Sequence, residues 1–163
     1  MTLYNSIHVL SIVLVGLAAG LFYGWDCSII GGLGKLSDKE YLTAFQSINR
    51  VILNPYFLIS FMGSLIALAI ATWLNYKTGN LDSFYYLLAA TLVYAIGLFG
   101  VTMLGNVPLN NLLDRFDISN ASTEAINAMR QKFEAKWNML HHIRTYAAIL
   151  SFLLSIISLM KKS

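Results

Sequence analysis

The side chains of this 163-residue chain that can do acid–base chemistry are few, and they lie at the ends of long apolar segments. His141 and Arg144 are three residues apart, and Asp26 follows Trp25 at the end of the first apolar segment. A neutral imidazole can accept a proton near pH 7, and a guanidinium can stabilise an oxygen anion. The remaining candidates are amides and indoles, which bind ligand oxygens without charge or form aromatic walls: Trp25, Trp137, Asn49, Asn54, Asn106 and Asn110.

The composition excludes several classes of protein. Hydrophobic residues make up 57% of the chain and charged residues only 12%, which is too apolar for a disordered chain or an ordinary soluble globule. The net charge of +3 comes from scattered basic residues, which indicates membrane topology and argues against a nucleic-acid partner. Cys27 is the single cysteine, so the sequence excludes an intrachain disulfide and a metal site of paired cysteines.

Three segments contain no Asp, Glu, Lys or Arg: residues 1–25, Val51–Tyr76 and Ser83–Leu113. A fourth, Thr145–Met160, reaches back to Trp137 if one arginine is tolerated. About 20 apolar residues span a hydrocarbon core as a helix. The sequence therefore predicts a single all-α domain over residues 1–163. This domain is an antiparallel bundle of four transmembrane helices at about residues 6–30, 53–75, 83–105 and 138–160.

The first apolar segment is expected to stay as a helix and not to be a cleaved signal peptide. Met1–Ser6 carries no basic residue, and Trp25, Asp26 and Cys27 do not form a cleavage site of small residues. We therefore expect an integral membrane protein, in a bacterial inner membrane.

The connections differ in length. Gly79 and Asn80 predict a tight turn between the second and third helices. The two longer connections, residues 31–52 and 106–137, lie together on the other face and are expected to carry short helices. Ser37 and Glu40 have the spacing of a capping box, and residues 124–136 form an amphipathic stretch. Pro108 is expected to end the third helix.

Antiparallel topology brings the candidate residues to one depth on the face of the long connections. His141 and Arg144 share a helix face, whereas His142 points about 100° away. An arginine inside a membrane normally faces the bundle and is paired, and Asp26 is its nearest candidate partner. The alternative is that Arg144 only extends to the interface. His8 lies about 27 Å from Asp26 along the first helix, too far to share a small site.

Structural roles remain open for several of these residues. Asn106 and Asn110 could cap the helix end, and Trp25 and Trp137 could belong to an interfacial aromatic belt. No metal signature is present, because adjacent histidines on a helix diverge and a third ligand is missing. We expect no metal and no cofactor. A haem or metal held by His8, His141 or His142 is the alternative.

Five short motifs occur in order along the chain: GLFYGWDCS at residues 20–28, FQSINR at 45–50, NP at 54–55, NVPLN at 106–110 and WNxxHxxRT at 137–145. Together they resemble the anthrone oxygenase-like family of small four-helix membrane proteins, also described as a domain of unknown function. The resemblance spans roughly residues 15–150. One departure is Gly31, where the family often has a proline.

The resemblance implies a four-helix bundle and, for some members, oxidation of polyketide anthrones to anthraquinones by O₂ without metal or flavin. In such a monooxygenase, His141 would be the base, and Arg144 would stabilise the oxyanion together with Asn106 and Asn110. Asp26 would orient His141 or neutralise Arg144. The tryptophans would stack on the substrate rings.

Three functional hypotheses follow. The first is a small membrane oxidoreductase, acting without a cofactor on a lipophilic, planar, anthrone- or phenol-like substrate at the loop face. The second is a non-enzymatic membrane protein that binds a lipid or quinone-like ligand or serves as an accessory subunit. The third is a structural or assembly protein. The expected partners are a lipophilic small molecule and the lipid bilayer, and homo-oligomerisation is left open.

Overall fold

Long helices follow directly from the long apolar segments of the sequence, and a computed structural model describes them for residues 3–161. Two are continuous α-helices, α4 (Pro55–Lys77) and α7 (Thr123–Met160). The other two combine α-helical and π-helical turns: α1 (Leu3–Gly24), η1 (Trp25–Ile29) and α2 (Ile30–Gly34), then α5 (Leu81–Val93), η2 (Tyr94–Gly100), η3 (Thr102–Asn106) and α6 (Val107–Asp114). A fifth helix, α3 (Asp38–Ile52), precedes α4. All four long helices are long and apolar enough to cross a membrane, and no strand occurs in residues 3–161.

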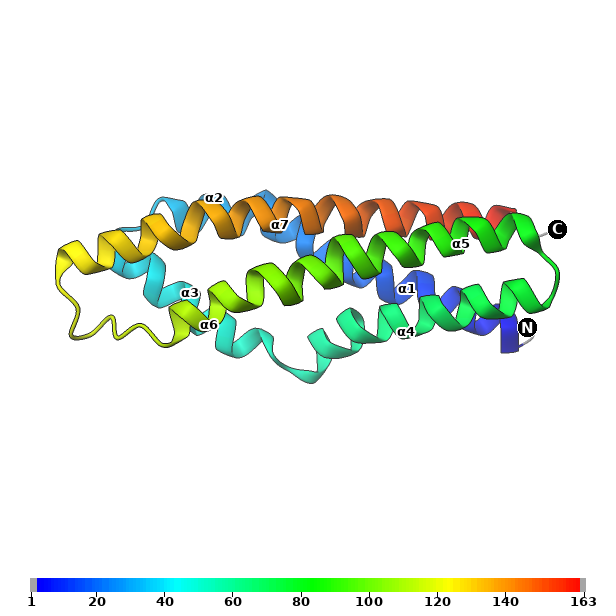
Figure 1. Cartoon of the computed structure of the whole chain (residues 1–163), viewed down its shortest axis with the longest axis horizontal. Helices are drawn as coiled ribbons and strands as arrows, with labels where there is room; N and C mark the ends of the chain where they lie inside the picture. Colours follow the sequence, from blue (N-terminus) through cyan, green and yellow to red (C-terminus); the bar gives the residue numbers. More distant parts are fainter. Residues whose placement is uncertain (1–2, 162–163) are drawn as a thin grey trace.

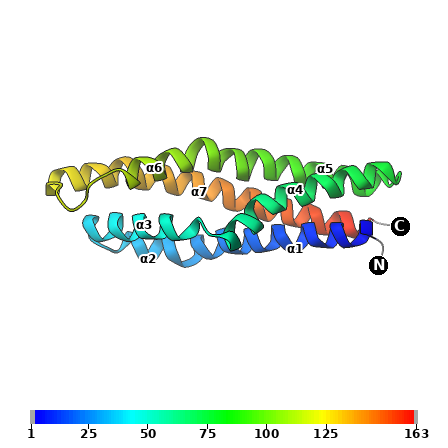
Figure 2. The same cartoon turned by 90° about the horizontal axis from the view of Figure 1, so that it is seen from below.

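The arrangement is an elongated antiparallel bundle with both ends of the chain at one end (Figure 1). In a second view, α3 runs beside α2, and α6 runs beside the first half of α7 (Figure 2). This confirms the predicted all-α bundle. The tight turn is also confirmed, because Gly79 has a φ of +76° that favours glycine, and Asn80 caps α5.

The helices extend further than the sequence predicted. α7 has 38 residues, about 57 Å at 1.5 Å per residue, which exceeds a hydrocarbon core of about 30 Å. The amphipathic stretch at residues 124–136 is therefore the first part of α7 and not a separate short helix. The third helix continues to Asp114. One end of the bundle thus protrudes beyond any membrane it spans.

Pro108 does not end the third helix, and that prediction was wrong. The N–H of Val107 bonds to the carbonyl of Thr102, five residues back, in the last turn of η3. Pro108 then stands in the first turn of α6, where its missing N–H and fixed φ are tolerated. A wide π-helical turn directly before the proline lets the helix continue.

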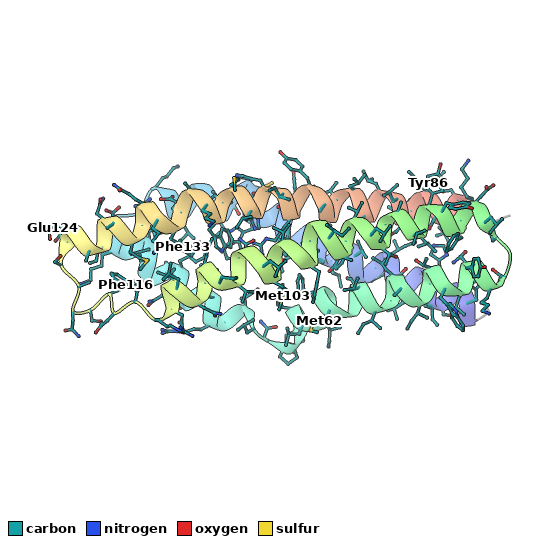
Figure 3. All side chains as sticks on the ribbon, in the orientation of Figure 1. Met62, Tyr86, Met103, Phe116, Glu124 and Phe133 are labelled. Carbon is teal, nitrogen blue, oxygen red and sulfur yellow. The ribbon has the colours of Figure 1, made fainter. Side chains whose placement is uncertain are left out.

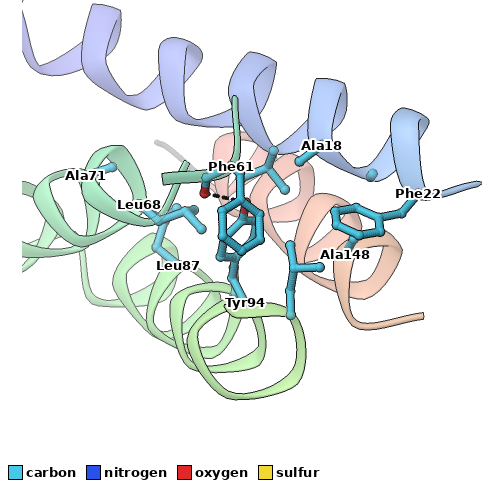
Figure 4. Close-up of a cluster of buried hydrophobic side chains, with 12 residues drawn as sticks. Ala18, Phe22, Phe61, Leu68, Ala71, Leu87, Tyr94 and Ala148 are labelled. Atoms are coloured by element: carbon cyan, nitrogen blue, oxygen red, sulfur yellow. Dashed lines mark hydrogen bonds between the residues drawn. The ribbon is translucent and has the colours of Figure 1, made fainter. Parts of the chain in front are cut away.

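Two apolar cores fill the bundle. The first lies among α1, α4, α5, η2 and α7 and contains Leu68, Leu87 and Tyr94, with the hydroxyl of Tyr94 donating to the carbonyl of Phe61 at 2.8 Å (Figure 4). The second lies in the protruding end, where Phe133 points inward between the helices (Figure 3) and its ring meets that of Phe45 edge-on at 4.7 Å.

Arg130 of α7 ties the α2–α3 connection to the protruding end. Its guanidinium donates to Asp38 at 2.9 Å and to the carbonyl of Leu36 at 2.8 Å, and it lies over the ring of Tyr41. The predicted capping box is present, since Ser37 and Glu40 bond reciprocally at the start of α3. These contacts fix α3 against α7 and so set the position of Asn49 near the end of α3.

Candidate functional site

A cavity of about 90 Å³ lies where the two cores meet, between η1, α3, η3 and α7. By the criterion of about 10–15 Å³ per water, it can hold several waters or part of a flat organic molecule. Six of the nine residues selected from the sequence line it: Trp25, Asn49, Asn110, Trp137, His141 and Arg144. The remaining wall is largely apolar: Leu21, Phe22, Ile52, Leu53, Phe57, Thr102 and Val107.

Arg144 carries a buried positive charge at this cavity. Its residue exposure is 5%, and its guanidinium carbon lies over the rings of Phe22 at 5.0 Å and Trp137 at 5.1 Å. It donates to Nδ1 of His141 at 2.9 Å and to Oγ1 of Thr102 at 3.4 Å. The two rings and two neutral acceptors compensate part of the cost of burying the charge.

No carboxylate lies within 4.0 Å of Arg144 in the described part of the chain. The expected pairing with Asp26 is therefore replaced by a different contact. Asp26 Oδ1 lies 2.9 Å from Nδ1 of His142 and 3.6 Å from Nε2 of His141. His141 thus lies between the guanidinium of Arg144 on the cavity side and the carboxylate of Asp26 behind it.

The contacts of His141 define its tautomer. A guanidinium can only donate, so Nδ1 of His141 must accept from Arg144 and carries no proton. Nε2 then holds the ring proton and donates it to the carbonyl of Phe22 at 3.2 Å. His141 is neutral in this arrangement, and its lone pair points at Arg144.

Aromatic rings form two sides of the cavity. The ring of Trp137 lies almost parallel to that of His141, with an interplanar angle of 8° and a centroid distance of 5.0 Å. Trp25 meets Trp137 at 5.8 Å and 43°. Nε1 of Trp137 donates to Oδ1 of Asn110 at 2.7 Å, which fixes the indole plane. Such walls favour a flat, aromatic ligand.

Three buried donors at the cavity have no protein partner among residues 3–161: Nε1 of Trp25, Nδ2 of Asn49 and Nε of Arg144. Unpaired buried donors are costly, and they are commonly kept where a ligand or water supplies the acceptor. The cavity is therefore complementary to a molecule with an apolar ring system and acceptor oxygens.

The other three residues selected from the sequence lie outside the cavity wall. Asn54 caps α4 by accepting from the N–H of Phe57 at 3.1 Å, at the edge of a neighbouring groove. Asn106 is fully buried behind Trp137 and donates to its carbonyl at 3.2 Å. Asp26 lies behind His141. His8 is far along the bundle and contacts Ser158 at 2.8 Å, as its predicted distance from the site requires.

Sequence reasoning missed Phe22 and Thr102. Phe22 precedes Trp25 by three residues, so helical spacing could have placed it on the same face. Thr102 lies in the π-helical turn η3, and no spacing in the sequence identified it. The π-helical turns η1 and η3 also carry site residues, in keeping with the frequent occurrence of such turns at functional sites. In residues 3–161, no group of three or more His, Cys, Asp or Glu side chains could hold a metal ion.

Comparison with known proteins identifies a family. The family model for anthrone oxygenase matches residues 56–154, more than half of the chain. Of the six predicted residues that line the cavity, Asn110, Trp137, His141 and Arg144 lie inside the matched segment, whereas Trp25 and Asn49 lie before it. No curated protein and no solved structure showed significant similarity. The matched segment covers three of the four long helices, and the chain belongs to the anthrone oxygenase family.

Proposed function

We propose that this protein is a membrane oxidoreductase that oxidises a planar, lipophilic aromatic C–H acid of the anthrone class with O₂. The observation that carries the proposal is the buried guanidinium of Arg144, which faces an aromatic cavity without a carboxylate partner within 4.0 Å in the described chain. A positive charge held there stabilises an anion that forms inside the cavity. Membership of the anthrone oxygenase family supports the same chemistry.

The reaction balances without a further reductant. An anthrone CH₂ group and one O₂ give a quinone C=O group and one H₂O. Loss of a C–H proton gives an enolate, which is electron-rich enough to reduce O₂ directly. The peroxide formed at that carbon then loses water to leave the second carbonyl.

In this proposal His141 takes the C–H proton. Its Nδ1 lone pair is held by Arg144 at 2.9 Å, so the guanidinium must turn from Nδ1 to the substrate oxygen as the enolate forms. This movement releases the base and stabilises its product in one step. Trp25 and Trp137 hold the ring system, and Asn49 and Asn110 contact substituent oxygens.

The proposal includes a route by which the substrate enters the cavity and the membrane in which the protein lies. A groove of about 450 Å³, lined mainly by apolar side chains of α1 and α4, shares Leu21, Ile52 and Phe57 with the cavity. A lipophilic substrate dissolved in the bilayer can reach the cavity along it. We place the protein in a bacterial inner membrane, with the lipid bilayer as its surroundings.

One observation favours the alternative of a non-enzymatic carrier for a quinone-like ligand. Both ring nitrogens of His141 are engaged, one by Arg144 and one by the carbonyl of Phe22. If Arg144 does not turn on binding, the site can hold an oxygen-bearing ring but cannot remove a proton from it.

Turnover separates the two functions. Purified protein in lipid nanodiscs is mixed with anthrone, and O₂ uptake and quinone absorbance are recorded. The proposal expects one O₂ consumed for each quinone, at a rate above that of an Arg144→Gln variant. Tight binding of anthraquinone without O₂ uptake would identify a carrier instead.

A further inference from the structure

Three side chains lead from the cavity to the outside of the bundle. We infer that Asp26 and His142 form a proton relay, which carries the proton taken by His141 out of the site. The inference rests on the proposed function, because it starts from a substrate proton. The sequence suggests His142 only as a ligand in the alternative haem or metal site, because it points away from the face shared by His141 and Arg144.

The three groups lie close together, but the relay needs small side-chain rotations: Nε2 of His141 donates to the carbonyl of Phe22, and Oδ1 of Asp26 accepts no hydrogen bond from residues 3–161 in this structure. Nε2 of His141 lies 3.6 Å from Oδ1 of Asp26, and the same oxygen lies 2.9 Å from Nδ1 of His142. Side-chain exposure rises along this path, from 2% at His141 to 19% at Asp26 and 50% at His142. One carboxylate oxygen therefore lies between the two imidazoles, one inside the cavity and one outside.

His142, the outer end of the proposed relay, lies where water can contact it. His142 is 18 residues from Met160, where α7 ends, or about 27 Å along the helix axis. A hydrocarbon core is about 30 Å thick. If Met160 lies at one boundary of the hydrocarbon core, His142 lies near the opposite boundary. The part of the bundle before His142 on α7 then protrudes from the membrane.

The proton balance is simple. His141 gains the substrate proton at Nδ1 and gives up its Nε2 proton to Asp26. The carboxylic acid then passes a proton to His142, which releases one to the aqueous side. One proton enters the chain and one leaves. A proton returns along the same path when the peroxide loses water, because the overall reaction releases H₂O and no net proton. Because aromatic rings form two sides of the cavity, a relay carries the proton past them without a water-filled path into the site.

In the described part of the chain, the charged groups that act on His141 belong to η1 and α7. Electrostatic effects on His141 come from Arg144, Asp26 and His142, and Arg144 is influenced by Asp26. The guanidinium opposes accumulation of a second positive charge on His141. A carboxylate on the outer side therefore draws the proton outward.

An anaerobic experiment tests the relay without oxidation. Protein in nanodiscs is mixed with anthrone in weakly buffered solution, and a pH-indicator dye reports proton release as the bound substrate ionises. In His142→Gln, which keeps a hydrogen-bonding group beside Asp26, release is expected to slow by about tenfold or more. This is less than the roughly 100- to 10,000-fold effect of a general base. Added imidazole should restore the rate.

The controls separate a relay from a structural contact. Tyr146→Phe removes an exposed hydroxyl one turn further along α7 and should leave proton release unchanged. Wild-type release in His142→Gln would overturn the relay, and so would slow release that imidazole does not restore. Proton release without aerobic turnover would leave the relay standing and contradict the oxygenase function.

Discussion

Nδ1 of His141 accepts a hydrogen bond from the buried guanidinium of Arg144 at 2.9 Å, and the two residues line one cavity three positions apart on α7. Arg144 thus hydrogen-bonds to the candidate base, His141. It is also the group that would stabilise the enolate formed when His141 removes a proton. A ligand with an anionic oxygen competes with His141 for Arg144. Binding and base activation are thereby coupled.

The charge and fork geometry of Arg144 should be required for turnover. Arg144→Gln keeps two donors but removes the charge, and Arg144→Lys keeps the charge but loses the planar fork. Removing one oxyanion donor typically lowers kcat by about 100- to 1,000-fold, and we expect both variants to fall in this range in the O₂-uptake assay.

The matched control is Arg50→Lys, which alters an exposed arginine paired with Asp114 at 2.7 Å. It should retain wild-type turnover. An Arg144→Gln variant with wild-type kcat would remove Arg144 from the chemistry.

The tautomer of His141 can be observed without any substrate. We expect ¹⁵N NMR of histidine-labelled protein to show a neutral ring with the proton on Nε2, because Arg144 donates to Nδ1 and Phe22 accepts from Nε2. In Arg144→Gln this preference should weaken, since a glutamine amide can also accept. A charged imidazolium for His141 in the wild-type protein at pH 7 would contradict the geometry.

The packing of η2 against α7 predicts a large effect from one methyl group. A Cβ on Gly97 would lie 2.7 Å from the Cβ of Ala147, closer than side chains approach. Gly97→Ala should therefore destabilise the bundle by about 1–3 kcal/mol, as overpacking does. Unfolding in detergent–denaturant mixtures measures this.

Gly20→Ala is the matched control, because nothing lies within 4 Å of the position that its added methyl group would take. Here the better helix propensity of alanine should be neutral or slightly stabilising. Equal destabilisation by the two variants would show that η2 and α7 do not approach so closely.

Asp38 makes the attachment of α3 sensitive to acid. Its carboxylate accepts from Asn127 at 2.8 Å and from Arg130 at 2.9 Å, and these hydrogen bonds hold its pKa below the ordinary value of 3.8. The folded pKa is lowered, so this contribution to stability is fully present above the unfolded pKa. It is lost as the pH falls through the folded pKa.

Hydrogen exchange of α3 reports that loss. Protection of α3 should be constant between pH 7 and 5 and fall only below about pH 4. Asp38→Asn should remove this acid-dependent step. A variant that keeps the same step would show that another carboxylate causes it.

The features that the sequence predicted correctly depend on local patterns. Four apolar segments predicted four long helices, and the spacing of Ser37 and Glu40 predicted the start of α3. The helix ends were less accurate, because residues 124–136 and α6 continue existing helices into the protruding end. The length of an apolar segment indicates how much of a helix can cross a membrane. It does not indicate how far the helix continues beyond the membrane.

The sequence predicted which residues lie together more accurately than it predicted their contacts. Six selected residues line the cavity because antiparallel topology brings their helix ends to one depth. Asp26 faces two histidines instead of Arg144, since the aim of its side chain depends on the π-helical turn η1. A π-helical turn has no simple sequence pattern, so the direction of the Asp26 side chain could not be predicted from the sequence.

The π-helical turn η3 makes the orientation of the third helix depend on a residue count. One residue advances an α-helix by about 100°, so a one-residue deletion within Thr102–Asn106 would let the turn close into an ordinary α-helix. The deletion leaves Asn110 and Pro108 chemically intact but changes the path by which they join the membrane half. In a relative that lacks one residue here, the helix before and after this segment would follow one continuous α-helical path. Asn110 would then face a differently shaped cavity, so we expect a relative with a gap at this position to bind a different ligand.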